Sequence, residues 1–338
     1  MVRPDDDSRS GAPGRLALIV RTRLLGRVET GVVIGTLLIV LFFAASTNGV
    51  WLNSIPSVLR VAAPVGVIAI GQALLMTSGE VDLSVGSVFA VAGVVFIWAM
   101  DALGIGVVPS MLIALATACA IGFLNGVLTV RFRVPSMIVT LGGMFVYRGI
   151  AYISTQGFSL SIPREYRKDV LVQFLKDRVF DISVTFIILL VLTAAFVFIL
   201  ARTRFGSHVM AVGGEPSAAL ANGVPVNAVK TKAFVICSGL AGLAGIMTVC
   251  QEGSVYSTSG VKMELETIAA AVIGGCTLSG GIGSIWGPIL GVFVLSSLKG
   301  GLMLMGAPTS WYIALVGAIL IGFLVVSKLM HQRMGLLN

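Results

Sequence analysis

The residues best suited to chemistry are two acids, Glu80 and Asp82, in the stretch SGEVDLSVGS (residues 78–87) between two long apolar runs. Residues two positions apart do not face each other on a helix, so this spacing argues against a paired acid–base site. Asp82 or Ser84 can instead cap the following apolar segment by accepting hydrogen bonds from its first backbone N–H groups. A second interpretation places the acids in a broken helix, where irregular backbone lines a pore.

Other patterns that support catalysis or metal binding are absent from the sequence. The Gly-rich stretch GGCTLSGGIGS has no lysine to neutralise a triphosphate, and Trp286 stands where the last glycine of a G-x-G-x-x-G motif would be. The four cysteines are far apart and the two histidines lie in basic loop or tail sequence. We therefore expect no catalytic residue, no cofactor and no metal site in this chain.

The composition places the chain in a lipid bilayer. Of its 338 residues 57% are hydrophobic and only 11% are charged, and the mean hydropathy is +1.01. A soluble domain carries about 25% charged residues. We predict an all-α polytopic membrane protein. The net charge of +8 then reports membrane topology, and we expect no nucleic-acid partner.

A spanning helix needs about 20 apolar residues. On this basis we predict about ten spans, at 30–48, 61–78, 85–100, 106–130, 135–154, 182–200, 231–250, 265–278, 284–299 and 310–327. The span at 265–278 is short and Gly-interrupted, so we expect a broken or re-entrant helix there.

The flanking sequence sets the predicted domain limits and orientation. We expect a disordered basic cytoplasmic tail over 1–29, one transmembrane domain over 30–330 and a second cytoplasmic tail over 331–338. With both termini in the cytoplasm, more than half of the 23 Lys and Arg residues fall in cytoplasmic segments, as the positive-inside rule requires. The external loop 155–181 is amphipathic, so either a short surface helix or a plain connector fits it.

Glycines recur at helix-packing intervals. Gly283, Gly287 and Gly291 repeat every four residues, and Gly122 and Gly126 share the same spacing. Small residues at this interval let two helix backbones approach closely in a membrane. We predict that both sets pack against neighbouring helices, and such a face can also border a pore.

The longest internal loop, 201–230, carries signals for a short helix. Gly213–Gly214 break the chain, Pro216 suits a first helical turn, and Glu215 is placed to favour the helix dipole. Gly223 then ends the segment. We predict a helix of about two turns on the cytoplasmic face, which suits docking into a groove of a partner.

Three stretches together resemble the sugar-type permeases of ATP-binding-cassette (ABC) importers, the family of ribose, xylose and galactose permeases. They are SGEVDLSVGSVFAVAG (78–93), VGGEPSAALANGVPVNAVKTKAFVICSGLAGLAG (212–245) and ETIAAAVIGGCTLSGGIGSIWGPILG (266–291). The resemblance covers most of residues 30–330 and leaves the tail 1–29 outside. The first stretch resembles the early acidic motif of the family, the second its coupling loop and the third its late Gly-rich segment.

The resemblance implies partners as well as a fold. It implies a homodimeric or pseudo-dimeric pore in the bacterial inner membrane, cytoplasmic ATPase subunits that bind ATP and Mg²⁺, and a periplasmic sugar-binding protein. Glu80 would then face the ATPase or an inner gate. The residues that match the coupling motif are Gly213, Gly214, Glu215, Ala218, Ala219 and Gly223. Many relatives have an Asn-led stretch where this chain has Glu215 followed by Pro216.

Polar residues within the spans are costly in lipid and are therefore candidates for the substrate path. They are Gln72, Asn125, Tyr147 and Arg148. A neutral sugar needs hydrogen-bond partners and aromatic faces, which these side chains supply in part. The structural alternative for each of them is a hydrogen bond between helices.

Two other transporter classes stay open. An ion-coupled secondary transporter would use intramembrane acids and broken helices, for which Glu264, Glu266 and the short span 265–278 are candidates. A branched-chain amino-acid permease of the ABC type would share the coupling loop and differ in the residues of the pore.

Overall fold

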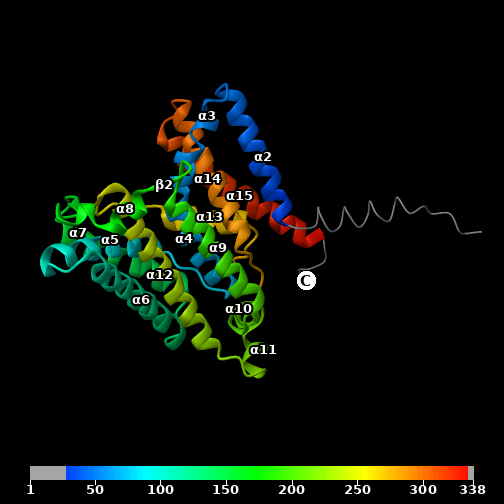
Figure 1. The fold of residues 1–338 in the computed structure, drawn as a ribbon. Helices are drawn as coiled ribbons and strands as arrows, with labels where there is room; N and C mark the ends of the chain where they lie inside the picture. Colours follow the sequence, from blue (N-terminus) through cyan, green and yellow to red (C-terminus); the bar gives the residue numbers. More distant parts are fainter. Residues whose placement is uncertain (1–27, 334–338) are drawn as a thin grey trace, which may run out of the picture.

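The computed structural model describes residues 28–333 and is almost entirely helical (Figure 1). Most of the predicted tails 1–29 and 331–338 lie outside these residues. The ten apolar helices are α2 (Val28–Ser46), α4 (Ile55–Thr77), α5 (Val85–Leu103), α6 (Val107–Arg131), α7 (Ser136–Thr155), α9 (Val184–Arg202), α12 (Val226–Glu252), α13 (Met263–Ile273), α14 (Trp286–Leu304) and α15 (Thr309–Arg333).

Each predicted span coincides with one of these helices. Among the described residues, seven helices are long and apolar enough to cross a membrane, and α2 and α15 contain shorter apolar stretches. The remaining helix, α13, has 11 residues and is therefore about 16 Å long, roughly half of a hydrocarbon core. The prediction of a broken helix at 265–278 is confirmed in that α13 ends at Ile273, before the glycines.

Short elements connect the long helices. The helical ones are α3 (Val50–Asn53), the 3₁₀ turn η1 (Tyr166–Lys168), α8 (Val170–Lys176), α10 (Arg204–Gly214) and α11 (Pro216–Ala221). The strands are β1 (Leu160–Ser161), β2 (Arg178–Val179), β3 (Ile182–Ser183) and β4 (Ser254–Val255), which form the antiparallel pairs β1–β4 and β2–β3. The sequence analysis predicted no strands, because two-residue strands are too short to show alternation.

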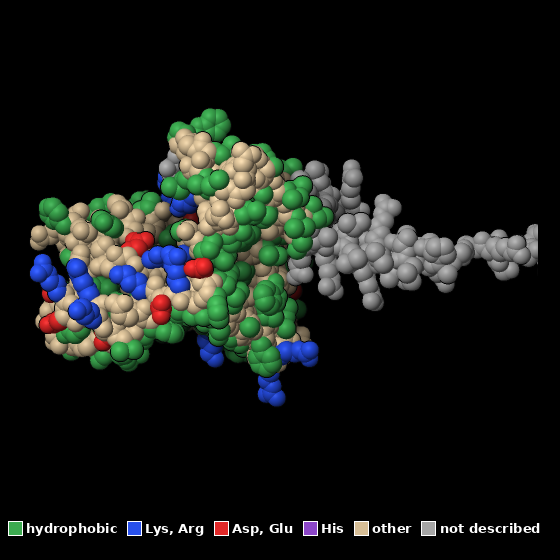
Figure 2. All heavy atoms as spheres, turned by 45° about the horizontal axis from the view of Figure 1, so that its top comes forward, with side chains coloured by type: hydrophobic (Ala, Val, Ile, Leu, Met, Phe, Trp, Pro, Cys, Tyr) green, Lys and Arg blue, Asp and Glu red, His purple; other side chains and the backbone are tan. Residues whose placement is uncertain are grey.

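The two ends of the molecule differ. Helices α10 and α11 lie at the lower end in Figure 1, which we call the α11 end, and α8 lies towards the opposite end. Of the two alternatives for the 155–181 loop, the short helix forms, as α8, whose cap Asp169 accepts a hydrogen bond from the Leu171 N–H at 2.9 Å. Figure 2 shows charged side chains of both signs gathered over one part of the surface, with hydrophobic side chains covering much of the rest.

Helices α4, α5 and α12 form the centre of the fold. Most of their residues are buried, whereas α6, α7 and α9 bury only one face and expose large apolar side chains. A helix that is apolar on all sides is expected where one side meets protein and the other meets lipid. Helix α4 also contacts a second buried cluster formed with α13, α14, α15 and α2.

Glycines allow the closest helix contacts. Gly122 and Gly126 lie where α6 meets α12, and a Cβ on Gly126 would stand 3.0 Å from Thr231 Cα. A Cβ on Gly122 would stand 2.5 Å from the carbonyl oxygen of Phe234. Real Cβ atoms do not approach that closely, so any side chain at these positions would separate the two helices.

The late glycine series is only partly helical. Gly287 and Gly291 lie on α14 and pack against Gly274 and Ala270 of the α13 region. Gly283 precedes α14 and packs instead against Thr77 at the end of α4. The interpretation of all three glycines as one helix face was therefore wrong for Gly283. This residue keeps the four-residue spacing but lies before the first residue of α14.

Candidate functional site

The acidic stretch forms a re-entrant segment, residues 78–84, between α4 and α5. The Val81 N–H donates to Ser136 Oγ at 3.3 Å and the Leu83 N–H donates to Thr140 Oγ1 at 3.1 Å. Two residues of extended chain and four residues of helix both advance about 6 Å, so the segment runs alongside the first turn of α7. The α7 hydroxyls thus satisfy backbone groups that would otherwise be buried without partners.

The segment enters the molecule from the α11 end. Further along α7, the Ser87 hydroxyl donates to the Met144 carbonyl at 3.0 Å, about 12 Å beyond Ser136 along the helix. Helix α5 therefore begins inside the molecule. There Gly86 faces Gly260 of the loop 253–262, which arrives from the opposite end, and neither glycine has room for a side chain.

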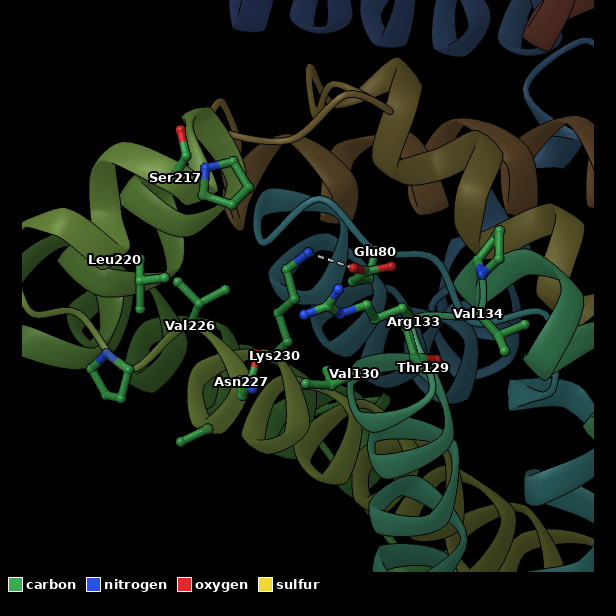
Figure 3. A pocket seen from close by; sticks show the side chains of 14 residues that line it. Glu80, Thr129, Val130, Arg133, Val134, Ser217, Leu220, Val226, Asn227 and Lys230 are labelled. Carbon is green, nitrogen blue, oxygen red and sulfur yellow. Dashed lines mark hydrogen bonds and ion pairs between the residues drawn. The ribbon is translucent and has the colours of Figure 1, made fainter.

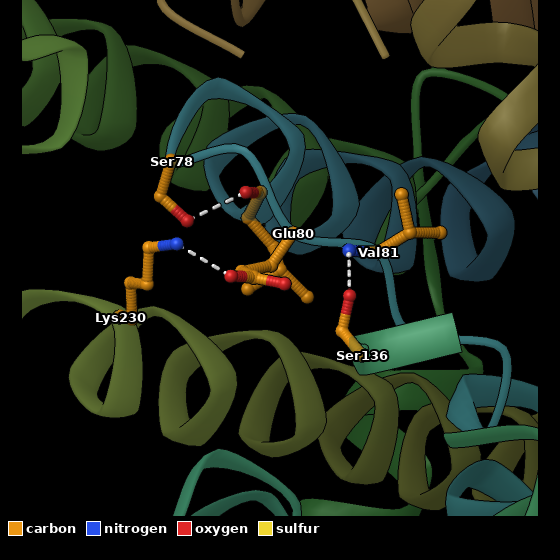
Figure 4. Close-up of polar contacts among 6 residues, drawn as sticks. Ser78, Glu80, Val81, Ser136 and Lys230 are labelled. Atoms are coloured by element: carbon orange, nitrogen blue, oxygen red, sulfur yellow. Dashed lines mark hydrogen bonds and ion pairs between the residues drawn. The ribbon is translucent and has the colours of Figure 1, made fainter. Parts of the chain in front are cut away.

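Glu80 forms an ion pair at the outer limit of this segment. Lys230 Nζ donates to Glu80 Oε1 at 2.5 Å (Figure 4), and it is the one ion pair found among the side chains that the structure describes. The Glu80 side chain is 12% exposed and the Lys230 side chain 17% exposed. Because water is largely excluded from this contact, loss of one partner would leave the other charge poorly solvated.

Asp82 lies deeper and is fully buried. Its Oδ1 accepts hydrogen bonds from the Ser84 N–H at 2.7 Å and the Ser84 hydroxyl at 2.6 Å, and its Oδ2 accepts one from the Ser238 hydroxyl at 3.4 Å. Ser84 is the N-cap residue of α5, but its hydroxyl donates to Asp82 and caps no helix N–H. The cap interpretation thus fails for Ser84, and Asp82 bonds only the N–H at the helix entry.

Two of the predicted path residues join this carboxylate. Asn125 Nδ2 donates to Ser84 Oγ at 3.0 Å, and the Tyr147 hydroxyl donates to Asn125 Oδ1 at 2.8 Å. We call Asp82, Ser84, Asn125, Tyr147 and Ser238 the Asp82 network. All five side chains are buried, and polar groups so far from water are tolerated when they are hydrogen-bonded in this way.

Gln72 lies beside the network with an unused donor. Its Oε1 accepts a hydrogen bond from Cys237 Sγ at 3.6 Å, and Cys237 precedes Ser238 in α12. Gln72 Nε2 is buried and has no hydrogen-bond partner. A buried donor without a partner destabilises the folded protein by about 1–3 kcal/mol. The Gln72 amide can therefore donate a hydrogen bond to a polar group that reaches it.

Arg148 is separate from these residues. Its Nη1 donates to the carbonyls of Ser257 and Ser259 at 2.8 and 2.6 Å. These contacts fasten α7 to the loop 253–262. Arg148 is thus committed to loop carbonyls, and the alternative of a hydrogen bond between helices is instead seen for Asn125 with Tyr147 and for Gln72 with Cys237.

The predicted short helix of the internal loop is confirmed as α11. Glu215 is its N-cap, and its Oε1 accepts from the Ser217 hydroxyl at 2.6 Å and from the Ser217 N–H at 3.4 Å. The hydroxyl bond holds the pKa of Glu215 below its usual value, and the N–H bond adds to this. Gly223 follows with φ +79°, a conformation that glycine adopts without strain.

The sequence analysis did not predict α10, the helix before α11. Gly213 and Gly214 end α10 and so precede the break. Gly213 is buried against the Thr77 carbonyl, whereas Gly214 is exposed. On α11, Ala219 is buried and Ala218 is exposed, so one face packs on the protein and the other stays available to a partner.

A cavity of about 1060 Å³ joins α11 to the ion pair (Figure 3). Its lining includes Glu80, Arg133, Ser217, Leu220 and Lys230. The candidate site is therefore continuous from α11 through this cavity to the re-entrant segment and the Asp82 network. The sequence analysis missed Lys230 and Ser238 as site residues. Lys230 contributes only to the total of basic residues used for the topology, and no pattern in the sequence singles out Ser238.

Comparison with known proteins defines the class. The family model described as "Branched-chain amino acid transport system / permease component" matches residues 54–324. Because this match covers most of the chain, the protein belongs to that family of membrane permeases. It is thus a multi-pass permease component of an ABC transporter and not the ATP-hydrolysing subunit.

Individual relatives within this class are permease proteins, two of them from import systems. The chain is 33% identical to the ribose import permease protein RbsC of Escherichia coli K12 over 286 residues, 84% of this chain and 88% of that one. It is 31% identical to the inner membrane ABC transporter permease protein YjfF of the same strain, over 78% of this chain and 80% of that one. It is 33% identical to the autoinducer 2 import system permease protein LsrC of Photorhabdus luminescens, over 76% of both. No solved structure matches the chain.

Proposed function

We propose that two copies of this chain form the pore of an ABC importer for a sugar or a related small polar solute. The observation that carries the substrate class is the similarity to a ribose import permease over 84% of this chain. The side chains next to the re-entrant segment agree with it, because Asn125, Tyr147 and Gln72 offer neutral hydrogen-bonding groups and an aromatic ring.

The proposed topology has ten membrane crossings with both termini in the cytoplasm of a bacterial inner membrane. Its support is the distribution of basic residues, since Arg131, Arg202, Arg204 and Lys232 are all exposed near the α11 end. The name of YjfF as an inner membrane protein agrees. In this orientation the α11 end faces the cytoplasm and the loop 155–181 faces the periplasm.

The proposed partners are a cytoplasmic ABC ATPase, which holds ATP and Mg²⁺, and a periplasmic solute-binding protein. Helix α11 is the proposed ATPase contact, because it lies at one extreme of the molecule and exposes Leu220 (64%). The residues proposed for this coupling are Gly213, Gly214, Glu215, Ala218, Ala219 and Gly223.

In the proposed mechanism, a movement of α11 is transmitted to the buried polar residues around Asp82. Motion of α11 reaches Lys230 on α12 through the adjoining cavity, and the Lys230–Glu80 ion pair passes it to the segment 78–84. Displacement of that segment breaks the hydrogen bonds around Asp82. Asn125, Tyr147 and Gln72 then become free to bond the solute, and the proposed role of Arg148 is to keep the loop 253–262 in place.

A branched-chain amino acid is the second candidate substrate, favoured by the description of the matched family. Reconstitution separates the two. The chain is placed in liposomes with its ATPase and binding protein, and ATP-dependent uptake of ribose-like sugars is compared with uptake of leucine. Uptake of leucine alone would replace the sugar proposal. Uptake that persists without the ATPase and follows an ion gradient would contradict the whole mechanism.

The coupling role of α11 has its own test at Gly223. We expect Gly223→Asp to abolish ATP-driven uptake while the protein still inserts into membranes, because a carboxylate is added beside the docking helix. Gly223→Asn is the matched control, since Asn has nearly the same size and also tolerates positive φ. Normal uptake in the Asp variant would remove this position from the coupling mechanism.

A further inference from the structure

A groove runs between α6, α12 and α10 on the side facing lipid in the proposed topology. Its volume is about 820 Å³. Most of its lining is apolar, and the residues are Phe123, Val127, Val130, Arg131, Phe205, Asn227, Ala228, Thr231, Lys232, Val235 and Ile236. None of these residues belongs to the Asp82 network or to the ion pair.

The polar and apolar parts of the groove are separated along its length. Arg131 lies in the last turn of α6, and Lys232 lies in the second turn of α12. Phe123 lies eight residues before Arg131, about 12 Å further from the α11 end. The deep part of the groove is therefore apolar and the part nearest the α11 end is cationic.

The two cations have no acidic partner in the described part of the chain. No carboxylate is among the lining residues of the groove, and neither Arg131 nor Lys232 forms an ion pair with any side chain that the structure describes. Both side chains are exposed, and so is the ring of Phe123 (56%). An occupant must therefore carry negative charge at one end and an apolar body along the rest.

We propose that this groove binds one anionic phospholipid of the inner leaflet. The headgroup phosphate lies between Arg131 and Lys232, and an acyl chain lies against Phe123, Val127 and Ile236. Basic pockets between transmembrane helices on the cytoplasmic side take anionic headgroups in this way. The depth of the charges matches that of lipid phosphates if the α11 end is cytoplasmic, so the proposal rests on the orientation given under the proposed function.

The bound lipid would bridge two helices of the site. Arg131 belongs to α6 and Lys232 to α12, and these helices also carry Asn125 and Ser238 of the Asp82 network. A phosphate that bonds both cations holds the α11 ends of α6 and α12 together. We therefore expect the lipid to raise the thermal stability of the permease.

The test uses the full-length chain in a neutral detergent. Phosphatidylglycerol and phosphatidylcholine with identical acyl chains are titrated, and binding is followed by native mass spectrometry and by the shift in Tm. We expect phosphatidylglycerol to bind and raise Tm and phosphatidylcholine not to. Equal effects of both lipids would overturn the proposal. A Tm shift with inorganic phosphate alone would also overturn it, by showing a site for a free anion.

Variants locate the site. Replacing both cations, Arg131→Gln with Lys232→Gln, is expected to weaken phosphatidylglycerol binding about tenfold or more. Arg202→Gln with Arg204→Gln removes the same charge from the same end without touching the groove, and is expected to leave binding unchanged. Equal weakening by both pairs would indicate diffuse attraction and overturn the proposal. Phe123→Ala is expected to weaken binding without any change of charge.

The competing occupant is a second copy of the chain. Phe123→Cys reports on it, because a symmetric contact through the groove would let two copies form a disulfide under mild oxidation. We expect no such cross-link in membranes that contain phosphatidylglycerol. Efficient cross-linking would overturn the lipid proposal. Because these readouts involve neither ATP nor transport, their failure would leave the proposed transport function untouched, and failure of transport would leave this site untouched.

Discussion

At Asp82, a fully buried carboxylate accepts hydrogen bonds from two serines, and one of them, Ser84, also accepts from Asn125. This arrangement gives Asp82 a different surrounding from Glu80, which lies only two residues away but meets a lysine near the surface. Depth explains the difference, because positions two apart on an extended chain face the same side but lie about 6–7 Å apart along the segment.

The first prediction concerns the thermal stability of Asp82 variants, which depends on how many hydrogen-bond donors around Asp82 keep an acceptor. Asp82→Ala leaves the Ser84 N–H and two hydroxyls without an acceptor, at about 1–3 kcal/mol for each group that stays unpaired. Asp82→Asn keeps one oxygen for Ser84, and its amide can donate to Ser238. We expect thermal unfolding in detergent to show a large loss of Tm for Ala and a small loss for Asn. Equal losses would indicate that the carboxylate contributes nothing specific.

The second prediction concerns the pair of Glu80 with Lys230. Removing one partner leaves a mostly buried charge, which is expensive. Glu80→Gln and Lys230→Met should each reduce ATP-driven uptake, and Glu80→Lys combined with Lys230→Glu should restore part of it. Restoration beyond the sum of the single effects measures the interaction directly. If the double variant transports no better than the single ones, the ion pair does not link α12 to the segment.

Among the elements, the ends of α4 and α10 meet the loop before α14 at a contact made of backbone. The Gly281 N–H donates to the Thr77 carbonyl at 3.0 Å, and Gly213 of α10 lies against the same carbonyl. No side chain separates the three elements there. We therefore expect any movement of α10 to reach α4 through this main-chain contact.

This contact gives the third prediction, with a built-in control. A Cβ at Gly213 would overlap the Thr77 carbonyl and stand 2.5 Å from Gly281 N, whereas a Cβ at Gly214 would meet only Gly281 Cα, at 3.9 Å. We expect Gly213→Ala to lower Tm and reduce uptake, and Gly214→Ala to match the unmodified protein in both. Comparable behaviour of the two variants would contradict tight packing at Gly213.

Helices α10 and α11 and the segment 78–84 show how much of the site could be predicted from the sequence. Pro216 and Gly223 fix the start and end of α11 by local backbone preference, so both were predictable. Helix α10 was missed although Thr203 caps its start by accepting a hydrogen bond from the Gly206 N–H and Gly213–Gly214 stand at its end. The backbone of segment 78–84 is held by hydrogen bonds to hydroxyls of α7, more than 50 residues away. No local pattern in the stretch predicts such a contact. Apolar length located the helices well but not the re-entrant chain between them.

On the scale of the whole molecule, the two ends are distinguished by shape and by chemistry. The α11 end carries the short helix α11, the Glu80 ion pair and a set of exposed basic side chains. The opposite end carries α8 and the two strand pairs, β1–β4 and β2–β3. Segments from both ends meet at Gly86 and Gly260. The two segments thus contact each other inside the protein, and under the proposed function the orientation of the chain decides which segment faces the ATPase.

The last prediction tests that orientation. Phe180, between α8 and α9, is 96% exposed, and Leu220 on α11 is 64% exposed. Single cysteines at these positions, in a chain whose four native cysteines are replaced by alanine or serine, are treated with a membrane-impermeant maleimide in intact spheroplasts. We expect labelling of Phe180→Cys only, and labelling of Leu220→Cys only after lysis. The reverse pattern would place α11 outside, away from any ATPase, and would contradict the coupling mechanism together with the depth assigned to the lipid groove.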